Sequence, residues 1–422
     1  MSRPPDRLGA FPRAILVFGV AVVLSPLAGG GPDAARVRVV LLDQPAVEGP
    51  FSSLTAAGLS IGGGAPIPLD GIREIRFAAD SAPSSAAGKG IGLRVILRGD
   101  ESIRGAFTGG DADGIVLRPA DVPPLRLPFE AIRCIEAESS SKGPCDEPAR
   151  LHPARPGSDI AYTRSGDSFP GVVVGASEKG LVVENSEKKA STIAWADLVI
   201  AHLDVQGLPP TGGLAAEVET LDGSRLTATK VTGDAAGLTI ATRAGVEVSA
   251  PLASLRVIRW TGGRFVYASD MPYTGTYTDY QPDDNSAAKK TWYGERSDRT
   301  PREGCPLQIA GTRYRHGIAV HARSVVTIPL DKKFTTFATL FGIDDALELK
   351  SPPMGDVTAR VLVDGKPVWT SNGSVKGGEA ARTVGPIDVG GADVLVLEVD
   401  FGGGLYTMDR GDWCDPILVR KP

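Results

Sequence analysis

The chain has 422 residues, of which 42% are hydrophobic, so it can bury sizeable cores and is long enough for two or three domains. Glycine (52) and proline (33) are abundant and no long stretch shows helical spacing, which favours short strands joined by turns and hence a mostly β protein. The formal charge of −5 leaves no broad basic surface, which argues against binding to nucleic acid and against charge-driven binding to membranes.

The first 30 residues have the order of an export signal. Three arginines precede an apolar run at residues 14–24, and a stretch of small residues follows the run. The run is short for a transmembrane span, and an uncleaved N-terminal anchor is the alternative. We therefore predict a signal peptide at residues 1–30 and a secreted, periplasmic or cell-surface protein that has no transmembrane span after cleavage.

One pattern of short strands recurs four times before residue 262. Each copy has a turn, then a glycine that opens an alternating strand, then two apolar residues three positions apart that lead into a closing strand. The predicted copies lie at residues 36–78, 93–137, 159–203 and 214–260, and the first of them is degenerate. Their opening glycines are Gly58, Gly114, Gly180 and Gly237.

Each copy contains the elements of a small SH3-like or Sm-like β-barrel, because the three-residue apolar step matches one turn of 3₁₀ helix before the last strand. A four-bladed propeller is the alternative architecture. The spacers at residues 78–92, 138–159 and 204–213 are rich in small, polar and proline residues, which favours separate barrels joined by exposed connections. The degenerate first copy could complete a neighbour's sheet. We expect the repeats to present the C-terminal domain or to bind a protein partner.

Four cysteines in an exported chain suit up to two disulfides, and three complete pairings are open. We predict the pairs Cys134 with Cys145 and Cys305 with Cys414. Four unpaired buried thiols are the alternative. The cysteine spacings do not indicate a metal site, since the chain has no CxxC motif and no Cys/His cluster.

From residue 264 onward the strands lengthen and keep their alternation of apolar and polar residues. Asp364 and Gly365 stand between two such strands and are a strong hairpin signal. A series of antiparallel strands of this kind predicts a β-sandwich of two sheets.

The segment from Tyr314 to Ser324, YRHGIAVHARS, resembles the central motif of the NPCBM/NEW2 family, a carbohydrate-binding module found beside glycoside hydrolases that include family 98. Residues 267–271, 341–344 and 409–416 resemble the family's opening, middle and closing motifs, so the resemblance covers residues 264–421. It implies a galactose-binding-like jelly roll. Arg410 and Gly411 depart from the His and Ala that the family commonly has in its closing motif.

A sugar-binding module needs an aromatic face for the ring and fixed polar groups for its hydroxyls. Trp292 and Tyr293 lie in a predicted loop and are the stacking candidates, unless they pack beneath that loop. His316 and His321 are five residues apart and would face opposite sides of a regular strand, and a structural role is the alternative for each. The candidate carbohydrate-binding residues are Trp292, Tyr293, His316, His321, Asp344, Asp412 and Trp413.

Three carboxylates of this domain also suggest a cation. Asp344, Asp409 and Asp412 could bind a structural calcium ion if the ends of their strands meet, since calcium prefers several oxygen ligands. The alternative is that they cap turns and pair with arginines. No other cofactor is expected.

The sequence therefore predicts an exported, non-catalytic protein whose C-terminal β-sandwich binds a polysaccharide or glycan. The alternative is a structural or protein-interaction scaffold that has no sugar site. A glycoside hydrolase is disfavoured, because the signal, the repeats and the sandwich leave no stretch for a catalytic barrel.

Overall fold

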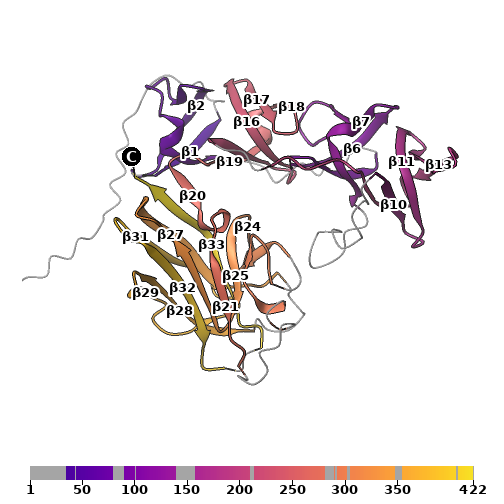
Figure 1. The fold of residues 1–422 in the computed structure, drawn as a ribbon. Coiled ribbons are helices and arrows are strands. Elements are labelled where there is room, and N and C mark those ends of the chain that lie inside the picture. Colours follow the sequence, from indigo (N-terminus) through magenta and orange to yellow (C-terminus); the bar gives the residue numbers. More distant parts are fainter. Residues whose placement is uncertain are drawn as a thin grey trace, which may run out of the picture.

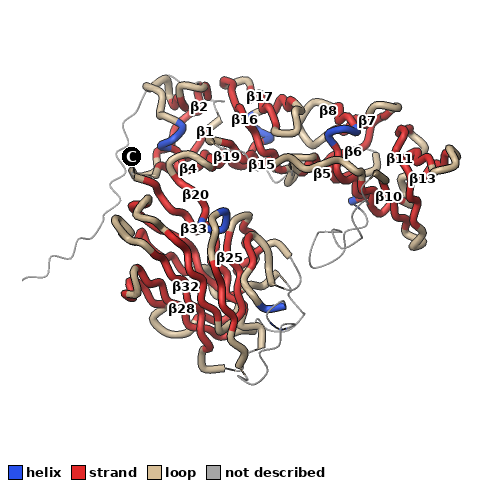
Figure 2. The backbone as a smooth tube through the Cα atoms, in the orientation of Figure 1, coloured by secondary structure: helices blue, strands red, loops and turns tan. Residues whose placement is uncertain are grey.

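The computed structural model describes residues 35–42, 44–78, 90–99, 101–138, 157–209, 213–280, 289, 292–301, 305–346, 354–404 and 407–421. These residues form an array of small β units that arches over a C-terminal β-sandwich (Figure 1). Strands dominate both parts, and the helices are short turns (Figure 2). The predicted fold class, small β repeats followed by a β-sandwich, is confirmed.

The predicted signal peptide at residues 1–30 lies outside the described residues. Within the described part of the chain, the structure contains no helix with the length and apolarity that a membrane crossing requires.

In each of the first two repeats a single 3₁₀ turn precedes the closing strand, and the first repeat has four strands where the second has five. The first repeat consists of β1 (Arg36–Leu41), β2 (Val47–Thr55), β3 (Gly58–Ile61), η1 (Leu69–Gly71) and β4 (Ile72–Phe77). The second consists of β5 (Gly92–Leu97), β6 (Ser102–Gly110), β7 (Gly114–Arg118), β8 (Leu125–Pro128), η2 (Phe129–Ala131) and β9 (Ile132–Ala137).

The other two repeats follow the five-stranded order of the second. The third consists of β10 (Asp159–Thr163), β11 (Ser168–Ser177), β12 (Gly180–Glu184), β13 (Ala190–Ala194) and β14 (Leu198–His202). The fourth consists of β15 (Ala215–Thr220), β16 (Arg225–Asp234), β17 (Gly237–Thr242), β18 (Glu247–Ala250), η4 (Leu252–Ser254) and β19 (Leu255–Thr261).

The recurring glycine has a steric cause. A Cβ atom at Gly58, Gly114, Gly180 or Gly237 would lie less than 3 Å from a backbone carbonyl oxygen of the neighbouring segment. Three of the four also have a positive φ, 141° at Gly58 and 156° at Gly180 and Gly237, a region that disfavours residues with a side chain. The repeat therefore requires glycine at the start of this strand, and this requirement is visible in the sequence.

The repeats join edge to edge in the spatial order first, fourth, second, third. The closing strands β4 and β19 pair antiparallel through Ile75 and Ile258, and β9 and β14 pair in the same way. A contact between β16 and β6 links the two pairs, so that all 19 strands belong to one sheet. Within each repeat the first strand pairs with the closing strand, as a small barrel requires. The repeats are nevertheless not separate, because the other edge of each closing strand satisfies its backbone groups by pairing with another repeat.

One apolar core runs through the whole array. The first residues of the closing strands, Ile72, Ile132, Leu198 and Leu255, are all buried in it. Between the second and third repeats, Phe107 packs on Trp195 with the ring centroids 4.5 Å apart. The array is therefore held together by side-chain packing as well as by backbone hydrogen bonds.

Both predicted disulfides are wrong, since Cys134 and Cys414 are buried free thiols. Cys134 lies on β9 opposite Ile96 and His202, and burial raises the pKa of its thiol to about 12. Cys414 packs in a small apolar cluster with Leu307, Ile309 and Ala319. Cys145 lies outside the described residues. Position on a buried strand, rather than pairing, accounts for these two cysteines.

The C-terminal domain is a sandwich of two antiparallel sheets. The first sheet consists of β22 (Arg296–Ser297), β25 (Gly317–His321), β33 (Arg410–Arg420), β27 (Phe334–Ile343) and β31 (Arg382–Asp388), with β20 (Phe265–Tyr267) added beside β33. The second consists of β21 (Thr274–Tyr277), β26 (Ser324–Pro329), β32 (Val394–Phe401), β28 (Asp356–Val363) and β29 (Lys366–Thr370), with β30 (Val375–Lys376) beside β28. The remaining elements are η5 (Ala268–Asp270) and the hairpin of β23 (Leu307–Ile309) and β24 (Thr312–Tyr314).

The predicted hairpin at residues 364–365 is confirmed. Asp364 and Gly365 join β28 to β29, with φ values of 47° and 76°. Two positive φ values in a row match a tight two-residue turn between twisted strands.

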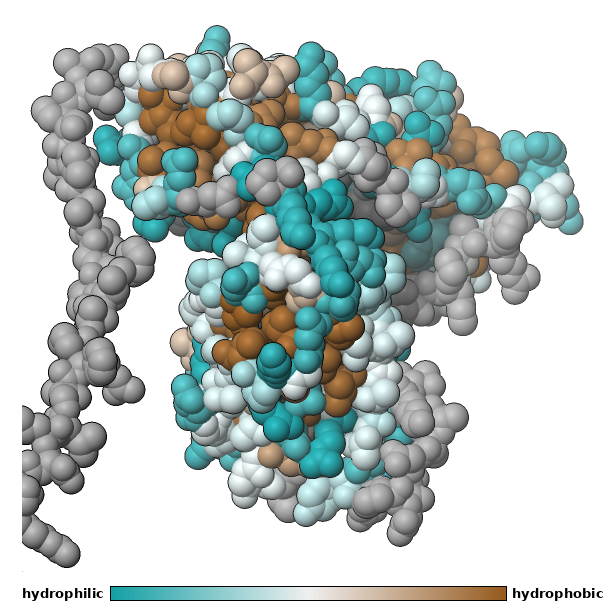
Figure 3. Space-filling view, turned by 60° about the vertical axis from the view of Figure 1, so that its left-hand side comes forward, coloured by the Kyte–Doolittle hydropathy of each residue, from teal (hydrophilic) through white to brown (hydrophobic). Residues whose placement is uncertain are grey.

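The array passes directly into the sandwich. Strand β20 follows β19 after three residues and pairs with the end of β33, opposite Val419, Leu418 and Ile417. Phe265 and Tyr267 of β20 are buried here, and Leu42 of the first repeat packs against them. The surface where the two parts meet is mainly hydrophilic, between apolar areas on the array and on the sandwich (Figure 3).

A buried carboxylate spans the seam between the first and fourth repeats. Glu74 on β4 pairs with Arg76 on the same strand and with Arg259 on β19, and its Oε2 lies 3.1 Å from Arg259 Nε. The side chain of Glu74 is only 3% exposed. A neighbouring pair, Arg256 with Glu219 at 3.3 Å, lies at the surface.

We predict that Arg259→Ala destabilises the array by about 2 kcal/mol, because the substitution removes a partner from a buried carboxylate. Arg256→Ala is the matched control on the same strand and should cost less than about 1 kcal/mol, since its ion pair is exposed. Chemical denaturation of the full chain measures both. Equal effects of the two substitutions would show that the buried pair does not hold the seam.

Candidate functional site

The two histidines of the central motif lie at opposite ends of β25. His316 directly precedes the strand and contacts Glu217 of the fourth repeat, so it lies at the junction with the array. His321 ends the strand and is paired with Arg410 at the start of β33, away from the array. The two residues therefore belong to two different sites.

Three rings gather at the end of the sandwich that faces away from the array, and we call Tyr277, Tyr293 and His321 the distal aromatic cluster. The centroids of Tyr293 and His321 are 4.7 Å apart, and Tyr277 lies 5.7 Å from Tyr293 and 6.1 Å from His321. His321 Nδ1 donates a hydrogen bond of 2.8 Å to the carbonyl of Ala322, which fixes the plane of the imidazole. Tyr277 and His321 are placed by the ends of β21 and β25, one strand from each sheet.

Polar groups adjoin these rings. The Tyr277 hydroxyl donates to Asp279 Oδ2 at 3.1 Å, and Lys289 Nζ lies 3.0 Å from the same oxygen. Trp292, next to Tyr293 in the chain, is 48% exposed. Tyr280 is 51% exposed and packs edge-on against Phe401. Trp292 and Tyr280 thus expose aromatic surface at the distal end, whereas Tyr277, His321 and Asp279 are buried, at 8%, 6% and 7% exposed.

Of the predicted carbohydrate-binding residues, the structure brings together Tyr293 and His321, with Trp292 beside them. Sequence reasoning missed Tyr277, Asp279 and Lys289. The signal for the first two was the run YTDY at residues 277–280, in which aromatic residues surround a carboxylate directly after an alternating strand.

The structure places Asp344, Asp412 and Trp413 in the interior. Asp412 and Trp413 are 0% exposed and Asp344 is 4% exposed. Trp413 packs on Phe341, with 4.5 Å between the ring centroids. The physical reason is that β33 lies between β25 and β27 and is covered on both faces along most of its length. These three residues belong to the core, and a ligand at the surface does not reach them.

Asp344 and Asp412 form a buried acid pair. Burial, followed by the charge of Asp344, raises the pKa of Asp412 well above its usual value. Burial raises the pKa of Asp344 to about 6, although its carboxylate accepts hydrogen bonds from the backbone N–H groups of Gln308 and Ala346. Apart from the Asp344 carboxyl group, the described part of the chain offers no hydrogen-bond donor to either oxygen of Asp412. The pair is therefore more stable when it holds a proton.

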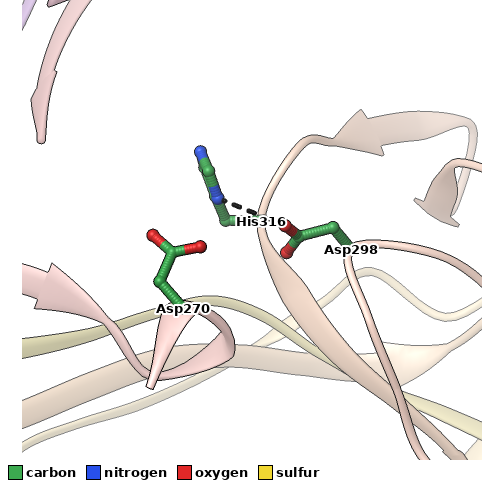
Figure 4. Close-up of side chains that lie close together, drawn as sticks. All are labelled: Asp270, Asp298 and His316. Atoms are coloured by element: carbon green, nitrogen blue, oxygen red, sulfur yellow. Dashed lines mark ion pairs between the residues drawn. The ribbon is translucent and has the colours of Figure 1, made fainter. Parts of the chain in front are cut away.

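Asp409, the third residue of the predicted calcium set, accepts a hydrogen bond of 2.9 Å from the backbone N–H of Asp356. Its pKa is raised to about 6, mainly by burial. Calcium binding by Asp344, Asp409 and Asp412 stays a prediction. Among the described residues, the acidic and histidine side chains that come within reach of one ion are Asp270, Asp298 and His316 (Figure 4).

The C-terminal domain is thus a β-sandwich of two antiparallel sheets, and segments at its distal end carry exposed aromatic groups. Residues 266–419 match the family model of the NPCBM/NEW2 domain. The resemblance found in the sequence is thus confirmed for the sandwich, and the match does not extend to the repeats. A search of curated proteins finds no match to this chain.

Several solved structures are similar to parts of the chain. A CBM51 module of a family GH95 protein from Clostridium perfringens, in complex with methyl-galactose, shares 22% identity over 37% of this chain and 99% of its own, with a TM-score of 0.31. A CBM51-2 and INT structure from Clostridium perfringens ZmpB, in complex with GlcNAc, shares 17% identity over 45% of this chain and 37% of its own, with a TM-score of 0.31. Tandem CBM51 modules of a family 98 glycoside hydrolase from Streptococcus pneumoniae share 13% identity over 78% of this chain and 88% of their own, with a TM-score of 0.30.

We predict that Asp412→Asn stabilises the protein at pH 8 and that the gain disappears near pH 4. The raised pKa means that the folded state holds a proton that the unfolded state releases above its ordinary value of 3.8. Wild-type stability therefore falls as the pH rises from about 4 through the raised pKa of the pair. An amide does not titrate, and a gain of about 1 kcal/mol would raise the melting temperature by about 2 to 4 °C.

Melting temperatures of the full chain at pH 4 and pH 8 measure this effect. Asp400→Asn is the control and should lower the melting temperature at pH 8. Asp400 pairs with Arg323 at 2.8 Å, and this pairing lowers its pKa despite the opposing effect of burial. A melting temperature of Asp412→Asn that does not exceed the wild-type value at pH 8 would contradict the account of the acid pair.

Proposed function

We propose that the C-terminal domain binds carbohydrate at the distal aromatic cluster and the residues around it. The observation that carries this proposal is the packing of Tyr293 against His321, with Asp279 close by and half-exposed Trp292 next in the chain, at the loop end of an NPCBM/NEW2 domain. A sugar suits such a site, because the C–H face of its ring packs on a flat aromatic side chain while its hydroxyls require fixed hydrogen-bonding partners.

Each group has a defined task in this proposal. Trp292 and Tyr293 offer ring faces to the C–H side of a pyranose, and such contacts are strong because they remove apolar surface from water. The Lys289 ammonium donates to ring or hydroxyl oxygens of the sugar, and Asp279, which is 7% exposed and pairs with Lys289, holds that ammonium in place. The hydrogen bond from Tyr277 holds Asp279 in place, so the site needs little ordering when a sugar binds.

We further propose that the protein is non-catalytic and exported. The acid pair of Asp344 and Asp412 does not suit glycoside hydrolysis, because the carboxyl groups are buried and adjoin each other, whereas hydrolysis requires carboxyl groups about 5 to 9.5 Å apart across a bound sugar. The order of residues at the N-terminus supports export to the periplasm, the cell surface or the medium. In this proposal the repeats are a scaffold that holds the sandwich with its distal end exposed.

We predict that the full chain binds at least one glycan on an array that includes methyl galactoside and N-acetylglucosamine, and that Trp292→Ala and Tyr293→Ala each weaken binding about tenfold. A tenfold loss corresponds to about 1.4 kcal/mol, which is the range expected for one aromatic contact. Titration calorimetry with the best glycan measures the loss.

Tyr162→Ala is the matched control, because Tyr162 is a half-buried aromatic residue of the third repeat, far from the distal end. It should bind glycans as the wild type does. If a folded chain binds no glycan, or binds one that neither distal substitution weakens, the carbohydrate site proposed here is wrong and the scaffold function is favoured.

A further inference from the structure

The imidazole of His316 is held in one orientation at the junction between array and sandwich. Its Nε2 lies 3.1 and 3.2 Å from the two carboxylate oxygens of Glu217, which comes from β15 of the fourth repeat. The ring stacks on Tyr267 with 3.8 Å between centroids and an interplanar angle of 8°. Because a carboxylate accepts, Nε2 donates its N–H to Glu217, and Nδ1 is the nitrogen directed elsewhere.

Nδ1 is a buried polar atom that lacks a hydrogen-bond partner, on a residue that is 7% exposed. It lies 3.7 Å from Asp298 Oδ2, and one oxygen of Asp270 completes a group of three ligand atoms that lie within 4.8 Å of one another. Figure 4 shows the carboxyl groups of Asp270 and Asp298 on either side of this part of the imidazole ring.

The two carboxylates differ in how they are held. Asp298 Oδ1 accepts a hydrogen bond of 2.9 Å from the backbone N–H of Gly317, which leaves Oδ2 on the side of His316. Asp270 ends the short helix η5 and is exposed, so the group is open to solvent on its side. A fixed ligand, an oriented imidazole and an open entrance are the parts of a site that can load an ion from solution.

We propose that His316 Nδ1, Asp298 and Asp270 bind a divalent transition-metal cation of the zinc class. One imidazole nitrogen and two carboxylate oxygens suit Zn²⁺ and its neighbours, whereas Ca²⁺ prefers oxygen ligands alone. Ligand atoms around an ion with bonds of about 2.1 Å lie roughly 3 to 3.5 Å apart. The 3.7 Å between His316 Nδ1 and Asp298 Oδ2 is close to this spacing, and the spread of up to 4.8 Å within the group requires the exposed Asp270 side chain to move toward the ion.

Glu217 is a positioning residue in this proposal. A ligating histidine usually donates its other N–H to a carboxylate, which fixes the tautomer and raises the basicity of the ligating nitrogen. The Arg315 Nε lies 3.2 Å from Glu217 Oε1, so the carboxylate is held in place as an acceptor for the imidazole N–H. Because Glu217 belongs to the array and the three ligands belong to the sandwich, a bound ion would strengthen the attachment of the two parts.

The test uses the full chain and Zn²⁺ alone, with Ca²⁺ as the comparison ion. The protein has four histidines, so ¹⁵N labelling of histidine gives few enough resonances to assign by substitution. We expect Zn²⁺ to shift the Nδ1 resonance of His316 while its Nε2 keeps its proton, and Ca²⁺ to leave both unchanged. Calorimetry gives the affinities.

Asp270→Asn and Asp298→Asn should each weaken Zn²⁺ binding at least tenfold, and Glu217→Gln should weaken it about 10-fold to 100-fold. Asp331→Asn is the matched control, because Asp331 is an exposed carboxylate that pairs with Lys333 at a distance from the site. Circular dichroism verifies that every variant is folded. Unshifted His316 resonances, or affinities of folded Asp270→Asn and Asp298→Asn that equal the wild-type value, would overturn the proposal.

Discussion

The unpaired outer edge of each closing strand is the constraint on which the architecture depends. A strand edge exposes backbone donors and acceptors that must find partners, and here β4 pairs with β19 and β9 with β14. This pairing brings the fourth repeat beside the first and the third beside the second. Spatial order therefore departs from chain order, and one apolar core extends through repeats that could otherwise have been separate domains.

The same pairing determines how the sandwich is attached. Since β19 lies next to the first repeat, β20 emerges there and pairs with the last strand of the sandwich, and Leu42 covers the contact. One end of β25 then faces the array and the other faces away from it. His316 meets Glu217 at the first end, and His321 meets Tyr293 at the second. Two histidines five residues apart thus have different neighbours and different chemistry.

Charged side chains buried inside the sandwich lower its stability. Strand β33 runs between two other strands of its sheet and is covered on both faces, yet it contributes Arg410 and Asp412 to the core. Burial makes the charged form of Asp412 unfavourable, and the neighbouring Asp344 makes it more so. The junction also buries a carboxylate, that of Glu217. There the neighbouring Arg315 and His316 stabilise the charged form, so Glu217 stays ionised.

The sequence by itself determined the local and periodic features. The recurring glycines predicted four repeats because a side chain at that point would collide with a backbone carbonyl, and Asp364 with Gly365 predicted a turn that needs two positive φ values. The motif around His316 and His321 indicated the family of the sandwich. Tertiary structure alone decided the order of the repeats, the free state of Cys134 and Cys414, and the burial of Asp412 and Trp413. These depend on which strand edges and faces meet across long stretches of chain, and alternation within one strand does not specify its partner.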